Sequence, residues 1–239
     1  MLDEGLIRGD GVFEVIRLYD GRPFALERHL QRMQRSAEGL RLALDIEAVR
    51  ADVAAMLAAR ADDDELLRVL ATRGGVRIAL FEAMPAARGA CSLGRITYSP
   101  GRLLDQIKSL SYAANMLASR LARERGFDEA LLVTPHERIL ECPTASFFAV
   151  SAGVIRTPPL SDHVLDSITR QILVEVAEVR EEPITVAGLS QIDEAFIASS
   201  VAQVLAVNRI DDLELAAPGP LTRSAAELLR ARVHAGVDR

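Results

Sequence analysis

Lys108, in the stretch QIKSLSY, is the only lysine among the 28 basic residues of the 239-residue chain. Arginine serves as well as lysine for solvating a surface or pairing with carboxylates. It stays protonated at neutral pH, whereas a lysine amine loses its proton readily when buried. A single retained amine therefore raises the question of imine chemistry at Lys108, which the rest of the sequence must decide. Arginine-rich coding is the alternative, and it would leave Lys108 without a chemical role.

An imine-forming lysine commonly binds pyridoxal phosphate. This cofactor needs an acid beside its pyridine nitrogen and a site that binds its phosphate group. Glu141 interrupts the otherwise apolar stretch ILECPTASFF, where an unpaired carboxylate is costly. The stretch LDSITRQIL begins a predicted helix with the hydroxyls of Ser167 and Thr169, and helix N-termini bind anions. An outward-facing strand residue and an ordinary capped helix are the alternative interpretations.

Further groups that could bind a phosphate occur elsewhere in the chain. Ser199 and Ser200 stand where the strand of FIASSVAQ becomes a turn, and Arg32 could donate a charge-assisted hydrogen bond. A solvated helix face is the alternative for Arg32. The four histidines lack metal-ligand spacing, and the chain has no nucleophile elbow of a serine hydrolase.

Composition excludes several classes of partner. The net charge of −6 and a pI near 5.4 argue against a nucleic-acid partner. No apolar run reaches the roughly 18 residues of a membrane span, and the acidic start MLDEGLIRGD lacks a signal-peptide core. Cys91 and Cys142 form neither a disulfide framework nor a zinc motif. We therefore expect a cytoplasmic protein.

The elements that must position these groups are read from hydrophobic spacing. Helices are predicted at 27–40, 47–60, 111–125, 166–179 and 221–235, and strands at 12–19, 66–75, 76–83, 129–134, 137–143, 146–150, 154–159, 194–200 and 203–210. The strands between 129 and 159 read as an antiparallel meander. Without strict βαβ alternation the class is α+β, with a small domain over 1–98, a linker over 99–107 and a larger domain over 108–239. Lys108 would then lie at a cleft between the domains.

Five blocks occur in the order and approximate spacing of the class IV aminotransferase family: RGDGVFEVIRLYDGRPFALERHLQRMQRSA, IKSLSYAANMLASRLARERGFDEALL, RILECPTASFFAV, TPPLSDHVLDSITRQ and DEAFIASSVAQVLAV. That family comprises D-amino acid and branched-chain aminotransferases together with aminodeoxychorismate lyase. The resemblance implies the two-domain fold type IV, with pyridoxal 5'-phosphate as cofactor. The family usually has two strands before its GDG motif, so the first domain here is expected to be short or truncated.

The resemblance also implies roles for single residues. Lys108 matches the catalytic Schiff-base lysine, Glu141 the partner of the pyridine nitrogen and Tyr112 a tyrosine that faces the phenolic oxygen of the cofactor ring. Phosphate contacts are implied for Arg32, Ile168, Thr169, Ser199 and Ser200, and Ser146 replaces an asparagine that usually ends the glutamate block. No metal is implied.

The same resemblance implies substrate contacts at Phe13, at Arg77 and at the backbone N–H of Val201, and an ordinary surface arginine is the alternative for Arg77. The implied activity transfers an amino group between an amino acid, branched-chain or D-type, and a 2-oxo acid, in a homodimer. Tyr112 and the VFEVIR start favour this activity. The block ECPTAS resembles the lyase branch, so 4-amino-4-deoxychorismate lyase is the alternative. A pyridoxal-phosphate-binding protein with little turnover is the third interpretation.

Overall fold

The computed structural model describes residues 3–59 and 65–237, and the chain divides into two compact units. Unit 1 comprises Met1–Ala86, Gln106–Tyr112 and Val233–Arg239, and unit 2 comprises Ala87–Asp105 and Ala113–Arg232. The chain therefore passes between the units more than once. Lys108 belongs to unit 1.

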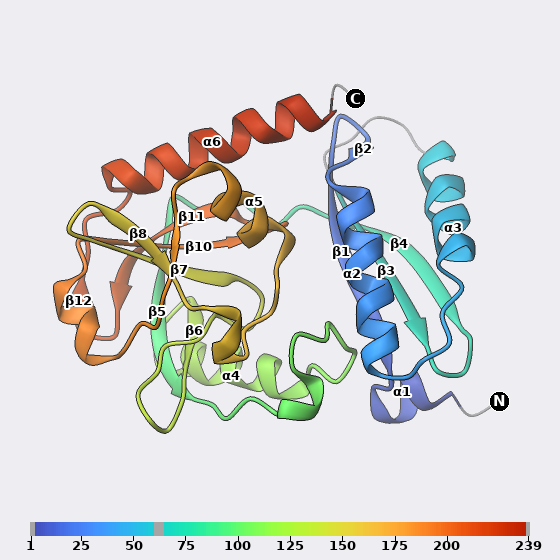
Figure 1. Cartoon of the computed structure of the whole chain (residues 1–239), viewed down its shortest axis with the longest axis horizontal. Helices are drawn as coiled ribbons and strands as arrows, with labels where there is room; N and C mark the ends of the chain where they lie inside the picture. Colours follow the sequence, from blue (N-terminus) through green and yellow to red (C-terminus); the bar gives the residue numbers. More distant parts are fainter. Residues whose placement is uncertain (1–2, 60–64, 238–239) are drawn as a thin grey trace. The chain divides into compact units, whose positions relative to one another are not determined.

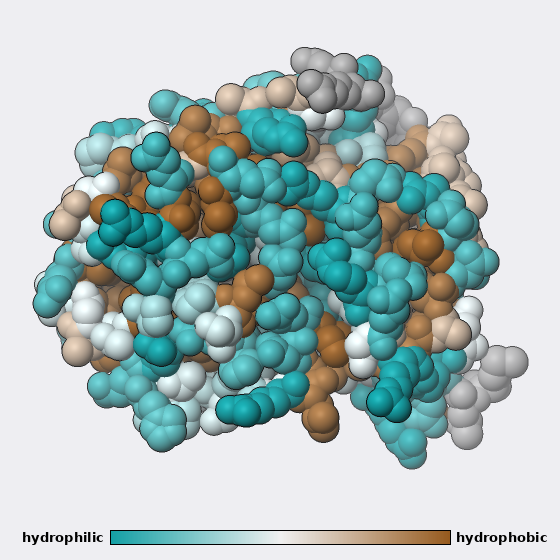
Figure 2. All heavy atoms as spheres, in the orientation of Figure 1, coloured by the Kyte–Doolittle hydropathy of each residue, from teal (hydrophilic) through white to brown (hydrophobic). Residues whose placement is uncertain are grey.

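Unit 1 is built on an antiparallel sheet in the order β2-β1-β3-β4, with two helices against one face (Figure 1). Its elements are α1 (Glu4–Arg8), β1 (Gly11–Tyr19), β2 (Arg22–Pro23), α2 (Leu26–Gly39), α3 (Ile46–Ala58), β3 (Glu65–Thr72) and β4 (Arg77–Ala83). Alternate residues of β1, among them Val12 and Ile16, pack on α2 and α3. The outward side of α2 carries exposed polar residues and looks hydrophilic in Figure 2.

Local signals explain where the elements of unit 1 begin and end. Asp45 caps α3, because its carboxylate accepts a hydrogen bond from the backbone N–H of Ala48. Gly75 adopts φ +85° in the turn between β3 and β4, a conformation that favours glycine. Asp3 caps α1 in the same way, and Gly9 ends it with φ +73°.

Unit 2 is built on an eight-stranded mixed sheet in the order β6-β5-β11-β10-β7-β8-β9, with β12 paired to β11. Its elements are β5 (Ala90–Thr97), η1 (Arg102–Leu104), α4 (Ala113–Glu124), β6 (Glu129–Val133), β7 (Ser146–Ser151), β8 (Val154–Thr157), η2 (Leu160–Asp162), α5 (Ile168–Val176), β9 (Arg180–Glu181), η3 (Ala187–Gln191), β10 (Glu194–Ser199), β11 (Gln203–Ile210), β12 (Leu213–Glu214) and α6 (Pro220–Val237). The β5–β6, β5–β11 and β8–β9 pairs are parallel, and the others are antiparallel.

Two features tie the helices of unit 2 to this sheet. The buried carboxylate of Glu194, on β10, accepts hydrogen bonds from the N–H groups of Leu221 and Thr222 and from the Thr222 hydroxyl at 2.7–3.0 Å. It thereby satisfies N–H groups at the start of α6. Helix α4 packs on β5 and β6 through small side chains such as Ala118 and Ala122. Among the described residues no helix is long and apolar enough to span a membrane.

Most predicted elements are confirmed, with three corrections. The segment 137–143 is not a regular strand: it makes isolated bridges through Arg138, Ile139 and Cys142, although the N–H of Leu140 donates to the carbonyl oxygen of Leu132 on β6. The expected antiparallel meander is only partly present at β6, which has antiparallel hydrogen bonds to residues 138–141 and pairs in parallel with β5. Strand β5 and helix α1 were not predicted, and α4 begins at Ala113 rather than residue 111. The predicted end of α3 at residue 60 lies outside the described residues.

Candidate active site

Lys108 lies in an extended segment that is hydrogen-bonded to the beginning of β1. The N–H of Phe13 donates to the carbonyl oxygen of Lys108 at 3.2 Å, and the N–H of Leu110 donates to that of Gly11 at 2.8 Å. Since β3 pairs with the other side of β1, this segment lies along the same edge of β1 as β2, at the opposite end of the strand. The N–H of Lys108 donates to the buried hydroxyl of Ser36 on α2 at 3.1 Å. Hydrogen bonds to β1 and to α2 therefore hold the backbone of Lys108.

The GDG turn before β1 makes this close pairing feasible. Gly9 has φ +73°, and a Cβ there would lie 3.2 Å from the carbonyl oxygen of Leu110. A Cβ on Gly11 would lie 2.5 Å from the carbonyl oxygen of Ala71 and 2.6 Å from the Leu110 side chain. Both glycines thus leave room for the segment that carries Lys108.

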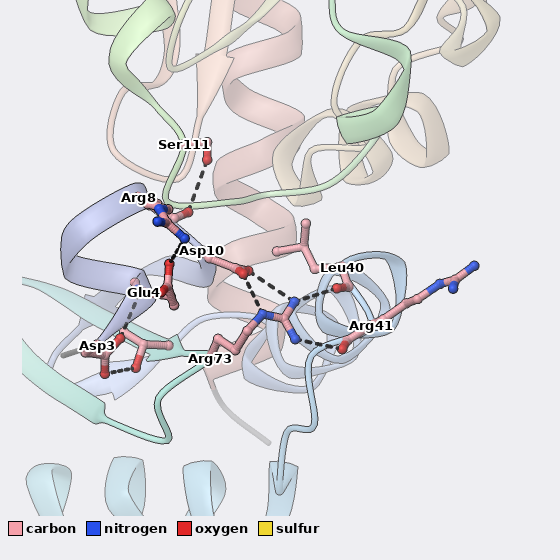
Figure 3. Close-up of polar contacts among 11 residues, drawn as sticks. Asp3, Glu4, Arg8, Asp10, Leu40, Arg41, Arg73 and Ser111 are labelled. Carbon is pink, nitrogen blue, oxygen red and sulfur yellow. Dashed lines mark hydrogen bonds and ion pairs between the residues drawn. The ribbon is translucent and has the colours of Figure 1, made fainter. Parts of the chain in front are cut away.

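Arg73 holds the same turn in place from the end of β3 (Figure 3). Its guanidinium donates to the carboxylate of Asp10 and to the carbonyl oxygens of Leu40 at 2.8 Å and Arg41 at 3.0 Å. These carbonyls follow the end of α2. On the other side of the turn, the Ser111 hydroxyl donates to the carbonyl oxygen of Gly9 at 3.1 Å. Arg73 therefore joins the GDG turn to α2.

The amine of Lys108 lies against aromatic rings. Its Nζ is 4.3 Å from the centre of the Phe13 ring and 5.6 Å from that of Tyr112, and the two rings meet edge to face with centres 5.3 Å apart. Arg68, on the same sheet face as Phe13, places its guanidinium carbon 5.6 Å from the Phe13 ring centre. Arg68 also forms a bidentate ion pair with Glu82 and is about one third exposed.

Three ionisable residues are buried behind this sheet. Arg32 Nε and Nη2 donate to the two carboxylate oxygens of Glu14 at 2.7 and 2.5 Å, and His29 Nδ1 is 2.7 Å from Glu14 Oε2. Burial opposes the charge of Glu14, but the charge and hydrogen bonds of Arg32, aided by His29, lower its pKa to about 2. Burial lowers the pKa of His29, against the effect of Glu14 and with small contributions from Arg32 and Lys108. Glu14 is thus an anion, and His29 is neutral at neutral pH.

Glu141 lies in unit 2, in the connection between β6 and β7. One carboxylate oxygen accepts from the N–H of Leu165 at 3.0 Å. Burial, and secondarily the Glu141 carboxylate, raise the pKa of Tyr98. A tight turn follows, in which Cys142 and Ala145 bond each other's backbones. Burial raises the pKa of the Cys142 thiol far above its ordinary value, so Cys142 stays protonated.

Ser146 begins β7 directly after that turn. Its hydroxyl oxygen is buried and has no hydrogen-bond partner among the described residues. A buried hydroxyl is costly to leave unsatisfied, which fits a group that bonds a ligand. This orphan hydroxyl is consistent with a cofactor in unit 2.

The N-terminus of α5 has the form of an anion site. Ser167 caps the helix, with its hydroxyl accepting from the N–H of Arg170 at 3.3 Å, and Ile168 and Thr169 form the buried first turn. The first N–H groups of a helix have no partner within the helix. Helix α5 packs on β10, which ends at Ser199. The Ser199 hydroxyl accepts from the N–H of Ala202 at 3.0 Å and shapes the turn that contains Ser200 and Val201.

Within unit 1 the structure brings together Lys108, Phe13 and Tyr112, with Arg32 buried nearby on α2. Arg77 is engaged elsewhere, because its guanidinium binds Asp52 of α3 at 2.6 Å. Sequence reasoning missed Glu14, His29, Ser36 and Arg68. A charge at a core-facing position of β1 was the available signal for Glu14, since Val12, Ile16 and Leu18 share that alternation.

Comparisons with known proteins decide the family. The family model for amino-transferase class IV matches residues 11–210. The chain is a class IV aminotransferase. As such it is an enzyme of the transaminase class, and the α+β fold expected from its sequence is confirmed by its similarity to solved fold type IV transaminases.

Relatives of this aminotransferase carry different substrate names. It is 34% identical to "Putative branched-chain-amino-acid aminotransferase" of Methanocaldococcus jannaschii, with 88% of this chain and 82% of the relative covered. It is 30% identical to a D-alanine aminotransferase of Staphylococcus epidermidis, with 87% and 82% covered. A hypothetical aminotransferase from Mycobacterium tuberculosis, solved in a PLP-bound form, is 28% identical, with a TM-score of 0.88 and 99% and 93% covered.

Proposed function

We propose that this aminotransferase transfers the amino group of an amino acid to a 2-oxo acid, with pyridoxal 5'-phosphate bound to Lys108 as a Schiff base. The observation that carries the proposal is the position of Lys108. The chain's only lysine is fixed by hydrogen bonds on both sides of its backbone and lies beside two aromatic rings. Bound pyridoxal phosphate supplies an electron sink for bonds at the α-carbon of the substrate.

Residues of unit 1 provide the amine and a fixed cation. Lys108 binds the cofactor and, when released from it, accepts and returns a proton. Arg32 binds the phosphate, which suits a guanidinium held rigidly by Glu14. The phenol of Tyr112 contacts the phenolic oxygen of the cofactor ring. The neutral state of His29 leaves Arg32 as the fixed cation of this buried group.

Residues of unit 2 provide an acid and hydroxyls. Glu141 holds a proton on the pyridine nitrogen, which keeps the ring electron-poor. The first turn of α5, with Ile168 and Thr169, binds the phosphate together with Ser199 and Ser200. Ser146 takes the place of the asparagine that usually ends the glutamate block, and its orphan hydroxyl supports a hydrogen bond to the cofactor or to Glu141.

The substrate carboxylate needs a cation or free N–H groups. Val201 offers a backbone N–H, and Phe13 provides an apolar wall. Arg77 remains the candidate named from sequence, but its pairing with Asp52 would have to open. Arg68 is the better placed cation, because it shares the Phe13 ring with Lys108. Its pairing with Glu82 uses Nε and Nη2, so within the described part of the chain Nη1 is left for a substrate carboxylate.

A panel of amino donors tests this function. Branched-chain L-amino acids, D-alanine, other amines and aminodeoxychorismate are each incubated with the holoenzyme, and the new amino acid formed from the 2-oxo acid is measured. We expect transfer from at least one amino acid. Pyruvate from aminodeoxychorismate without any transfer would identify the lyase, the alternative suggested by Cys142 beside Glu141. Light scattering tests the proposed homodimer.

A further inference from the structure

A tight turn at residues 142–145 connects the two groups of unit 2 that the proposed function assigns to the cofactor ring. Glu141 precedes this turn, and Ser146 follows it. The N–H of Cys142 donates to the carbonyl oxygen of Ala145 at 2.8 Å, and the N–H of Ala145 donates back at 3.4 Å. Within the turn, Thr144 is exposed and the other three residues are buried. The position of the 142–145 turn therefore influences where the carboxylate and the hydroxyl lie.

Both flanks of the 142–145 turn are attached to the sheet of unit 2. The N–H of Leu132 on β6 donates to the carbonyl oxygen of Glu141 at 2.9 Å, and Ser146 pairs in register with Ala198 on β10. The turn itself lies between these attachments, and Pro143 has no N–H with which to add a bond there. Because Pro143 is buried, its carbonyl oxygen needs a donor from elsewhere in the protein.

Asn115 supplies such a donor from α4. Its Nδ2 donates to the Pro143 carbonyl oxygen at 3.2 Å, and because a carbonyl can only accept, the nitrogen of the amide must face it. Asn115 continues the helix face of Ala118 and Ala122, which are buried where α4 packs on β5 and β6. An asparagine at the start of a helix commonly caps it by accepting from a backbone N–H. Asn115 instead donates away from its own helix, to the 142–145 turn.

A hydrogen bond from Glu141 to the pyridine nitrogen would depend steeply on distance and angle. We propose that Asn115 is a positioning residue, which holds the 142–145 turn and thereby keeps the Glu141 carboxylate within reach of that nitrogen. The inference rests on the role proposed for Glu141. The N–H of Leu165 holds one carboxylate oxygen at 3.0 Å, whereas Asn115 holds the main chain that follows Glu141. Asn115 acts through the turn and not through contact with the cofactor.

Amide exchange tests the hydrogen bond itself. The chain contains two asparagines, Asn115 and Asn208, so holoenzyme grown with 15N-labelled asparagine gives two pairs of side-chain amide signals. Asn208 is exposed on β11, and Asn208→Leu assigns the signals by removing its pair. We expect one amide proton of Asn115 to exchange with water about 5-fold more slowly than those of Asn208, the factor typical of one net hydrogen bond.

Pyridoxal phosphate labelled with 15N in its ring tests the positioning role, because its signal reports whether the pyridine nitrogen is protonated. Asn115→Leu keeps the approximate size of the side chain and removes the donor. In this variant we expect the ring signal to move toward the position of an unprotonated nitrogen, and the dissociation constant of the cofactor to rise about 5-fold. A role of Asn115 in fold stability alone would not move the ring signal of the folded protein.

Two further variants make the result specific. Asn208→Leu makes the same change at an exposed asparagine and should leave the ring signal and the dissociation constant at their wild-type values. Asn115→Gln retains an amide donor on a longer side chain, so its ring signal should lie closer to that of wild type than the signal of Asn115→Leu does.

Equal exchange of the Asn115 and Asn208 amides in wild type would overturn the inference, even if Asn115→Leu does not fold. A wild-type ring signal in folded Asn115→Leu would do the same. The proposed function fails separately, if wild-type protein binds no pyridoxal phosphate or binds it with an unprotonated ring nitrogen although the Asn115 amide exchanges slowly.

Discussion

Arg32 and Glu14 form a two-pronged ion pair in the interior of unit 1, with their side chains 6% and 0% exposed. A buried pair of this kind stabilises a protein little compared with apolar residues, but losing one partner leaves a buried charge. We therefore predict that Glu14→Gln lowers the free energy of unfolding by about 3–5 kcal/mol, measured by urea titration. The matched control is Glu82→Gln, which breaks the similar but one-third exposed Arg68 pair and should cost about 1 kcal/mol or less. Equal losses would contradict the assigned burial.

Acid should unfold the protein partly through Glu14. The pKa of Glu14 is about 2 in the folded protein, below the ordinary value of 4.5 that applies to the unfolded chain. As pH falls, the unfolded chain therefore binds the proton first. The contribution of Glu14 to stability is complete above pH 4.5 and is lost toward pH 2. In Glu14→Gln this part of the acid dependence should disappear, measured as unfolding free energy against pH. A wild-type-like slope over that interval would refute the assignment.

His29 should contribute a second pH dependence, with the same sign. Its pKa in the folded protein lies below 6.5 because of burial, so below that pH the unfolded chain is protonated while the native histidine remains neutral. Stability from His29 is present above pH 6.5 and declines as pH falls through and below that value. Between about pH 7.5 and 5.5, His29→Gln should therefore lose less stability than wild type. Exposed His136→Gln serves as the control and should match wild type.

The GDG turn should be sensitive to a single methyl group. Gly11→Ala places a Cβ 2.5 Å from a backbone oxygen and against Leu110, so the segment carrying Lys108 must shift. We predict that the Leu110 N–H is less protected from hydrogen exchange in Gly11→Ala than in wild type. We also predict a lower rate of Schiff-base formation. Gly101→Ala, where a Cβ meets open space, is the control. Unchanged protection in Gly11→Ala would show that the turn does not position Lys108.

Arg73→Ala tests the link between the GDG turn and α2 (Figure 3). It removes hydrogen bonds to one carboxylate and two backbone carbonyls, and because the side chain is 39% exposed we expect only a modest fall in the melting temperature. Arg8→Ala, which removes one exposed pair within α1, should be nearly neutral. A thermal melt of the three proteins decides between these outcomes, and equal melting temperatures for Arg73→Ala and wild type would contradict the link.

Periodicity predicted most of the elements, because strands such as β1 and helices such as α2 carry strong alternation or helical spacing. It did not predict the parallel pairing of β5 with β6 and β11, since partner choice depends on contacts far apart in sequence. The five-residue helix α1 is too short for a periodic signal. Arg32 was placed on α2 correctly, yet its burial depends on Glu14, whose pairing no local pattern reveals.

In the proposed function, Lys108 is the amine that binds pyridoxal phosphate. The most direct measurement adds the cofactor to purified protein, reduces the adduct with borohydride and locates the added mass by peptide mass spectrometry. We predict that the added mass lies on Lys108, and that Lys108→Ala shows neither this adduct nor transaminase turnover. Cofactor trapped only at the N-terminal amine, or full turnover by Lys108→Ala, would exclude Lys108 as the Schiff-base residue.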